Sequence, residues 1–143
     1  MLKRLFGLIA LIAFAILVKA DPVSELIKNS GNAKDFPGAG KLIIFDSTFS
    51  DVQETGLTYV YTHQLYKILT AKGALDLRTI TYGYDPLSAY VEIRKVLIHH
   101  IGGEVEELNI ETIMDYPAPA RAIYWGASEK MIDVGRLEPG DAV

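Results

Sequence analysis

Residues 57–73, LTYVYTHQLYKILTAKG, are the longest stretch of this chain with strand character, and they limit the folds that it can adopt. The run is rich in β-branched and aromatic residues, contains no Pro and has no Gly before its last position. Because Thr, Tyr and Val are poor helix formers, a helix of this length is disfavoured. Alternate residues of a strand face opposite sides, and here both sides mix apolar and polar residues. The pattern predicts a long strand that is partly covered on both faces and ends in a turn at Lys72-Gly73.

Shorter strand-like segments separated by turns occupy most of the remaining chain. They span residues 41–49, 76–84, 90–101, 104–110, 122–125 and 131–134, with Gly102-Gly103 as a two-residue hairpin turn and residues 116–119 as a loop. Residues 22–29 are compatible with a short helix, capped by Ser24 and ended near Gly31. No long amphipathic helix alternates with the strands, which argues against a parallel α/β fold. We therefore expect an all-β fold, an antiparallel β-sandwich of about seven to nine strands.

The N-terminus has the three-part layout of a secretory signal peptide. Lys3-Arg4 precede an uninterrupted apolar run at residues 5–18, and Lys19-Ala20 follow it. This run of 14 residues is shorter than the roughly 20 that a membrane-spanning helix needs. We predict a signal peptide at residues 1–20, a linker with the possible short helix at 21–40, and a β-sandwich domain at 41–143. The mature protein would be exported, either periplasmic or secreted; an uncleaved N-terminal anchor is the alternative.

The C-terminal residues also indicate how the domain is organised. Residues 137–141, LEPGD, read as a tight turn, and Ala142-Val143 begin what looks like another strand. A domain seldom stops at that point, so we expect the sandwich to be incomplete at its C-terminus and the sequence to be part of a longer protein. An incomplete sandwich has an unpaired edge strand, which predicts self-association or low stability.

Charge and cysteine content exclude several classes of function. Removal of residues 1–20 takes away three basic residues and no acidic one, which changes the formal net charge from −4 to −7. An acidic chain without a basic cluster is poorly suited to bind nucleic acid or an anionic membrane. The chain has no cysteine, so it has no disulfide, thiol nucleophile, thiolate zinc site or iron–sulfur site.

Three patterns could indicate a phosphate-binding, metal or catalytic site, and the sequence gives each of them little support. The segment 38–41, GAGK, lacks the Gly five residues earlier and the Ser or Thr after Lys41 that a phosphate loop requires. His99 and His100 are adjacent and would face opposite sides of a strand, so only one of them could join His63 in a metal site. Four serines lack the context of a nucleophile elbow; they are Ser47, Ser50, Ser88 and Ser128.

Two further groups of residues have an ordinary structural explanation and a functional one. Glu104, Glu106, Glu107, Glu111 and Asp115 form an acidic hairpin limb. It could supply paired carboxylates or calcium ligands, but a charged edge strand that resists aggregation explains it as well. Aromatic residues are numerous and could line a glycan- or peptide-binding face, although core packing uses the same residues; they include Tyr59, Tyr61, Tyr66, Tyr82, Tyr84, Tyr90 and Trp125. We expect no catalytic, cofactor-binding or metal-binding residue and no cofactor.

The order of several short segments resembles a known domain. These segments are 36–39 (FPGA), 42–46, Gly56, 67–73 (KILTAKG), 84–86 (YDP), the Gly-Gly hairpin and 137–141 (LEPGD). Together, over about residues 36–143, they resemble the uncharacterised β-rich domain that precedes transglutaminase-like domains in exported bacterial proteins. The chain differs from the pattern of that domain at Ile101-Gly102-Gly103, where members of that group often carry Asp-Gly.

The resemblance implies a β-sandwich of unknown role, with the catalytic Cys, His and Asp in the downstream papain-like domain. No catalytic residue can be assigned to this chain on that basis. The first functional hypothesis is a non-catalytic accessory domain of an exported transglutaminase-like protein, with that downstream domain as its partner. The second is an independent binding module for glycan or peptide, and the third is an enzyme in its own right. We expect no nucleic-acid partner, and no membrane partner after signal cleavage.

Overall fold

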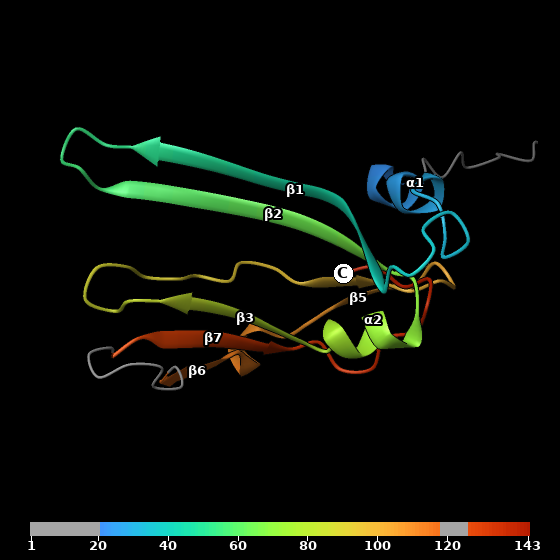
Figure 1. Ribbon diagram of the computed structural model, residues 1–143. Coiled ribbons are helices and arrows are strands. Elements are labelled where there is room, and N and C mark those ends of the chain that lie inside the picture. The colour runs from blue at the N-terminus through green and yellow to red at the C-terminus, as the bar shows by residue number, and fades with distance from the viewer. Residues whose placement is uncertain (1–20, 118–125) are drawn as a thin grey trace, which may run out of the picture.

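The computed structural model describes residues 21–117 and 126–143 (Figure 1). The expected signal peptide at residues 1–20 and the expected strand at 122–125 therefore lie outside the described residues. Within the two described ranges, none of the helices has the length and apolar character needed to cross a membrane.

The regular structure of the described chain is mostly antiparallel strand, with two short helices and one 3₁₀ turn, and much of the rest forms turns and irregular segments. The strands are β1 (Lys41–Val52), β2 (Thr58–Ile68), β3 (Thr79–Tyr84), β4 (Leu97–His99), β5 (Val105–Glu107), β6 (Met114–Pro117) and β7 (Ser128–Asp133). The helices are α1 (Pro22–Asn29) and α2 (Ala71–Asp76), and the 3₁₀ turn is η1 (Ile110–Thr112). Every named strand pair is antiparallel, which confirms the expected all-β fold.

β1 and β2 form a long hairpin that makes up much of one layer (Figure 1). The pairing runs from Lys41–Ile68 at the base to Val52–Thr58 at the tip, with an irregularity between Ile43 and Phe45. At the tip the Gln53 amide donates to the Leu57 carbonyl, and Gly56 adopts a positive φ of 87° that glycine accommodates without strain. The central run is thus a strand over most of its length, as expected.

The second layer is a three-stranded sheet in the order β3-β7-β6. The hydrophobic core lies between the two layers and draws on both; its buried members include Ile68, Ile98, Leu77, Ile132 and Val134. The Tyr82 hydroxyl of β3 also donates to the Gln64 side chain of β2 over 3.1 Å, which ties the layers together. This is the packing of a β-sandwich.

Residues 140–143 join the hairpin to β4. On one side, Tyr66 and Val143 exchange two backbone hydrogen bonds of 2.8 Å each. On the other side, His99 and Ala142 exchange two more, of 2.8 and 2.9 Å. The first layer therefore has the order β1, β2, residues 140–143, β4, β5, and the strand expected at Ala142-Val143 is present as paired, extended backbone.

The expected turn at Lys72-Gly73 is wrong. β2 ends at Ile68, and Lys72 and Gly73 lie inside α2, whose N-cap is Thr70 with its side chain accepting from the Gly73 amide over 3.2 Å. Gly73 packs on the backbone of Gly40 so closely that a Cβ at this position would overlap the Gly40 carbonyl. Gly73 is required by this contact between α2 and the start of β1, not by a turn.

Other expected boundaries also change. Within the segment 90–101 the strand is only Leu97–His99, flanked by one backbone bond from Leu108 to the Val96 carbonyl, and residues 85–95 turn back from β3 outside any strand. The hairpin after β4 has a three-residue loop, 101–103, closed by His100 donating to the Glu104 carbonyl, with Gly103 at φ 90°. The expected loop at 116–119 is strand β6 as far as Pro117, and Pro119 lies outside the described residues.

α1 covers the outer side of the hairpin base (Figure 1). Its bounds match the expected helix, but the N-cap is Asp21, whose carboxylate accepts from the Val23 amide, and not Ser24. Lys67 of β2 donates its ammonium protons to the Ile27 carbonyl (2.8 Å) and the Gly31 carbonyl (2.7 Å). A cation at the carbonyl end of a helix is favourable for both hydrogen bonding and the helix dipole, so Lys67 fixes α1 against the sandwich.

Candidate functional site

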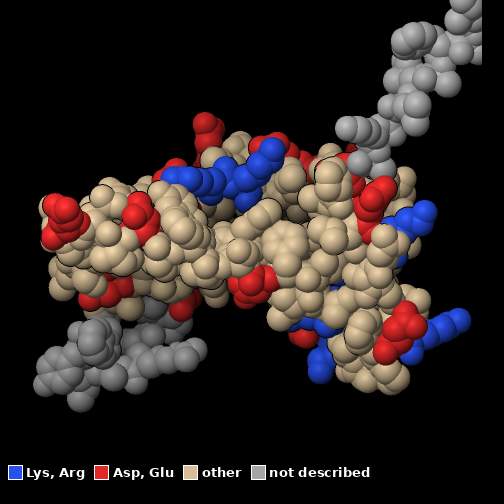
Figure 2. Space-filling model, turned by 90° about the horizontal axis from the view of Figure 1, so that it is seen from above, with Lys and Arg blue, Asp and Glu red and all other residues tan. Residues whose placement is uncertain are grey.

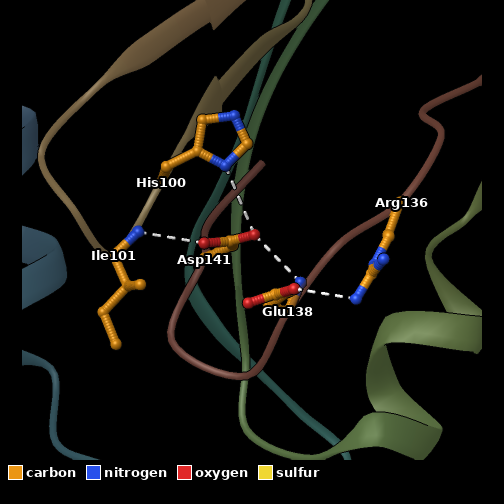
Figure 3. A pocket seen from close by; sticks show the side chains of 5 residues that line it. All are labelled: His100, Ile101, Arg136, Glu138 and Asp141. Carbon is orange, nitrogen blue, oxygen red and sulfur yellow. Dashed lines mark hydrogen bonds and ion pairs between the residues drawn. The ribbon is translucent and has the colours of Figure 1, made fainter.

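A pocket lined mostly by titratable side chains lies where the β4–β5 loop meets the turn before residues 140–143 (Figure 3). It has a volume of about 220 Å³ and is lined by His100, Ile101, Arg136, Glu138 and Asp141. The first two residues come from the end of β4, and the other three come from the segment after β7. The pocket therefore exists only because residues 140–143 pair beside β4.

Asp141 is the centre of this pocket. Its side chain is only 3% exposed, which is rare for a carboxylate and requires compensating hydrogen bonds. One oxygen accepts from the Ile101 amide at 2.9 Å, and the other accepts from the Glu138 amide at 2.9 Å. The carboxylate thus closes its own turn and holds that turn to a loop 40 residues earlier.

His100 adds a titratable group to the pocket. Its Nε2 lies 3.3 Å from Glu106 and its Nδ1 lies 3.5 Å from Asp141, so the ring sits between two carboxylates. The bond to Glu106 and the nearby charge of Asp141 raise the pKa of His100 above its ordinary value. The protonated ring is therefore the form that this arrangement favours.

The geometry of this pocket supports a structural role more than catalysis. Both oxygens of Asp141 are occupied by backbone donors, so this carboxylate is not free to act as a base. Arg136 and Glu138 pair with each other at 3.2 Å, and their side chains are 89% and 60% exposed. No hydroxyl or thiol nucleophile lines the pocket.

The histidines that could have formed a metal site are not brought together. His63 lies on the hairpin with its ring edge-on to Phe45, at 4.7 Å between centroids. His99 is buried, and its Nδ1 has no hydrogen-bond partner among the described residues. Searching residues 21–117 and 126–143 gives no group of three side chains that could hold a metal ion.

The serines and the glycine-rich segment have structural positions. Ser47 lies opposite His63 in the hairpin ladder, and Ser50 is exposed near its tip. Ser88 hydrogen-bonds Asp85 in an exposed turn, while Ser128 begins β7. Within the GAGK segment, the Gly40 carbonyl accepts from Leu69 and Thr70, which anchors the entry to β1.

The residues of the acidic limb do not form one cluster, because they pair with different basic side chains. Glu107 pairs with Lys95 at 3.2 Å, on the same hairpin as the Glu106–His100 pair. Asp115 is on the other sheet, where it pairs with Lys130 at 2.8 Å and accepts from the Tyr84 hydroxyl at 2.7 Å. These bonds lower the pKa of Asp115 and raise those of Lys130 and Tyr84. The side chains therefore behave as exposed ion pairs, which contribute little to stability individually.

The tyrosines do not share one face. Tyr66 and Tyr82 pack against the core between the layers, where burial raises both of their pKa values. Tyr84 is bonded to Asp115, and Tyr90 is 77% exposed in the turn-back after β3. Trp125 lies outside the described residues.

Tyr59 and Tyr61 belong instead to an exposed apolar surface on the distal half of the hairpin, which we call the ribbon. It consists of Phe49, Val52, Leu57, Tyr59, Val60 and Tyr61, which are 41–69% exposed. The Phe49 and Tyr61 rings stack at 6.2 Å, and the Arg94 guanidinium lies 5.1 Å from the Tyr61 ring centroid. Most of the surface seen from above is uncharged (Figure 2).

Neither the pocket nor the exposure of the ribbon is predicted from the sequence. Residues 137–141 have the composition of a turn, and nothing local indicates that Asp141 reaches Ile101. The mixed polarity of both faces of β2 predicts a strand partly covered on both sides, whereas residues 58–63 are exposed and only residues 64–68 are partly or fully buried.

Comparison with known proteins gives one family. No curated protein and no solved structure matches the chain significantly. The model of a family described as a "Domain of Unknown Function with solved-structure structure (DUF3857)" matches residues 54–143, which run from the hairpin tip through the pocket. Because that match covers more than half of the sequence, the chain belongs to the DUF3857 family of domains of unknown function.

Proposed function

We propose that this chain is a non-catalytic accessory domain of an exported protein that also carries a transglutaminase-like domain. The domain would support or orient its catalytic neighbour through direct contact. Residues 1–20 would direct export and be removed. The resemblance of the segments within residues 36–143 to domains found beside transglutaminase-like domains supports this assignment.

The ribbon is the observation that carries the proposal. An isolated two-stranded hairpin is at best marginally stable in water, and this one exposes apolar side chains along its tip. Phe49 is 64% and Val60 59% exposed, and they come from neighbouring ladder positions that face opposite sides. Clustered exposed apolar residues are typical of a surface that contacts another protein or domain. A ribbon exposed on both sides fits a contact that wraps around it.

The positions of the polar side chains support this role. The pocket around Asp141 uses its one buried carboxylate to hold backbone amides. His63, His99 and His100 occupy three separate environments. The proposed activity therefore belongs to the neighbouring domain, and this chain affects it by contact.

The test is made on the full polypeptide that contains this chain. We would replace Phe49 and Tyr61 with Ser and measure both the acyl-transfer or peptidase activity of the neighbouring domain and the susceptibility of the protein to limited proteolysis. The matched control replaces Ser50 and Thr62 with Ala, which changes the same stretch of hairpin without removing aromatic surface. We expect lower activity and faster cleavage only for the aromatic variant. A polypeptide without a transglutaminase-like domain, or equal behaviour of both variants, would refute the proposal.

A binding module for glycan or peptide is the second candidate. The stacked Phe49 and Tyr61 rings beside the Arg94 guanidinium are the observation that favours it, since aromatic faces and cations are common in such sites. Tyrosine fluorescence during titration with cello- and chito-oligosaccharides and with an unstructured peptide would test it. Saturable quenching that is lost in Tyr61→Ser would favour binding, and no quenching would remove this candidate.

A further inference from the structure

The edge of β2 that faces away from β1 is only partly paired. The Tyr66 and Ile68 amides point to this side and donate to the Val143 and Asp141 carbonyls, each at 2.8 Å. The Leu57 carbonyl and the Leu69 amide point to the other side and bond Gln53 and Gly40. In an antiparallel ladder, alternate residues direct their backbone groups to opposite edges.

The same alternation defines an open edge further along β2. It comprises the backbone N–H and C=O groups of Thr58, Val60, Thr62 and Gln64. In the described residues the only strand partner of this part of β2 is β1, on the other side. Within residues 21–117 and 126–143, the open edge therefore has four amides and four carbonyls without a backbone partner, directly beyond the point where Val143 pairs.

This edge lacks the features by which proteins protect free strand edges. Its residues include neither Pro nor a charged side chain, and three of the four are β-branched. Charges, Pro and bulges normally discourage a further strand, and β-branched residues favour one. Three of the exposed apolar residues of the ribbon, Tyr59, Val60 and Tyr61, lie on the same strand, so pairing at the open edge would also cover part of that surface.

Residues 140–143 determine the direction from which a further strand would enter. They run antiparallel to β2, and the Val143–Tyr66 pair is the one nearest to the open edge. A strand on the same line would place its second residue opposite Gln64 and continue toward Thr58. On its other side Ala142 already pairs with His99, and residues 90–95 before β4 make no backbone–backbone hydrogen bond within the described chain.

We propose that the open edge is the acceptor site for one further β-strand, delivered in covalent continuation of residues 140–143 and antiparallel to β2. It would extend the first layer toward the hairpin tip. Side chains on the side of Val143 would face the core, because Val143 and Tyr66 pack against it. The strand should therefore be apolar at alternate positions. This proposal concerns backbone pairing and does not rest on the link to a transglutaminase-like domain.

A designed extension tests the acceptor site directly. The full chain would be compared with the same chain extended after Val143 by the octapeptide Thr-Val-Thr-Val-Thr-Val-Thr-Val. The control extension has Pro at its second and fourth positions, where an amide would otherwise donate to β2. The readout is amide hydrogen exchange by NMR at Val60, Thr62 and Gln64, with Tyr61 as an internal reference because its amide faces β1.

We expect the octapeptide to slow exchange at Val60, Thr62 and Gln64 by about tenfold or more, the order expected for gaining a backbone hydrogen bond. The Pro-containing extension should leave these amides as fast as in the plain chain, and Tyr61 should not change. Equal exchange with both extensions, whether fast or slow, would overturn the proposal. Slow exchange of the same amides in the unextended chain would also overturn the proposal if it appears only at concentrations where sedimentation detects a dimer. A second copy of the chain would then occupy the open edge.

Discussion

Replacing Asp141 with Ala should be the most damaging single change in the polar part of this fold. The variant removes an acceptor that is 3% exposed and that holds the Ile101 and Glu138 amides at 2.9 Å each. A hydrogen bond to a charged group contributes about 1.5–3 kcal/mol. Because water can reach the emptied pocket and rescue part of the loss, we expect about 3 kcal/mol for the two bonds together. At a typical stability of about 5–15 kcal/mol this is a large fraction of the total.

The measurement is urea unfolding at pH 7 followed by circular dichroism. Glu138→Gln is the control, because it changes a neighbouring carboxylate whose side chain is 60% exposed and pairs only with exposed Arg136; an exposed pair contributes at most about 1 kcal/mol. Asp141→Asn should fall between the two, since its amide keeps one acceptor oxygen but turns an NH₂ toward a backbone donor. A loss of less than about 1 kcal/mol in Asp141→Ala would show that the carboxylate does not hold the two loops together.

Three further predictions concern other contacts. The raised pKa of His100 means that its stabilising effect is complete below the ordinary pKa of 6.5 and is lost as the pH rises through the higher folded pKa. The stability advantage of the wild type over His100→Gln in urea unfolding should therefore shrink as the pH is raised above 6.5, and an advantage that grows with pH would contradict this. Gly73→Ala should destabilise the fold by about 3 kcal/mol or prevent folding, because its methyl group would overlap the Gly40 carbonyl, whereas the neighbouring Lys72→Ala should be nearly neutral in the same assay. Lys67→Met should release α1, because the two hydrogen bonds from Lys67 to carbonyls at the C-terminal end of α1 are lost. Amide exchange in residues 25–29 should then be faster than in the wild type. Unchanged exchange in these residues would show that other contacts hold the helix.

Local sequence signals predicted the elements whose cause is local. α1 follows Asp21-Pro22, a cap and a favourable first residue, and ends before Gly31. β1 and β2 are rich in β-branched and aromatic residues and were expected as strands. The turn at residues 137–141 was recognised by its Pro-Gly pair.

The errors arose where a distant contact decides the structure. Lys72-Gly73 has the composition of a turn, but Thr70 caps a helix there and Gly40 occupies the space above Gly73. Residues 90–96 have strand composition, but a strand needs a partner, and only Leu97–His99 have one through β5 and Ala142. The Asp141 pocket joins residues 40 positions apart, which no local pattern can indicate.

The pairing of residues 140–143 has a consequence for the order of folding during synthesis. β1, β2 and α2 form from neighbouring segments and can assemble as soon as residues 41–76 are available. β4 cannot be joined to β2 until residues 140–143 have been made, because in the described chain they are the strand between them. Closing such a long loop is entropically costly and slow. The nascent chain therefore has an exposed hairpin from the synthesis of residues 41–76 until the synthesis of residues 140–143. During this interval the hairpin most needs protection from association with other chains.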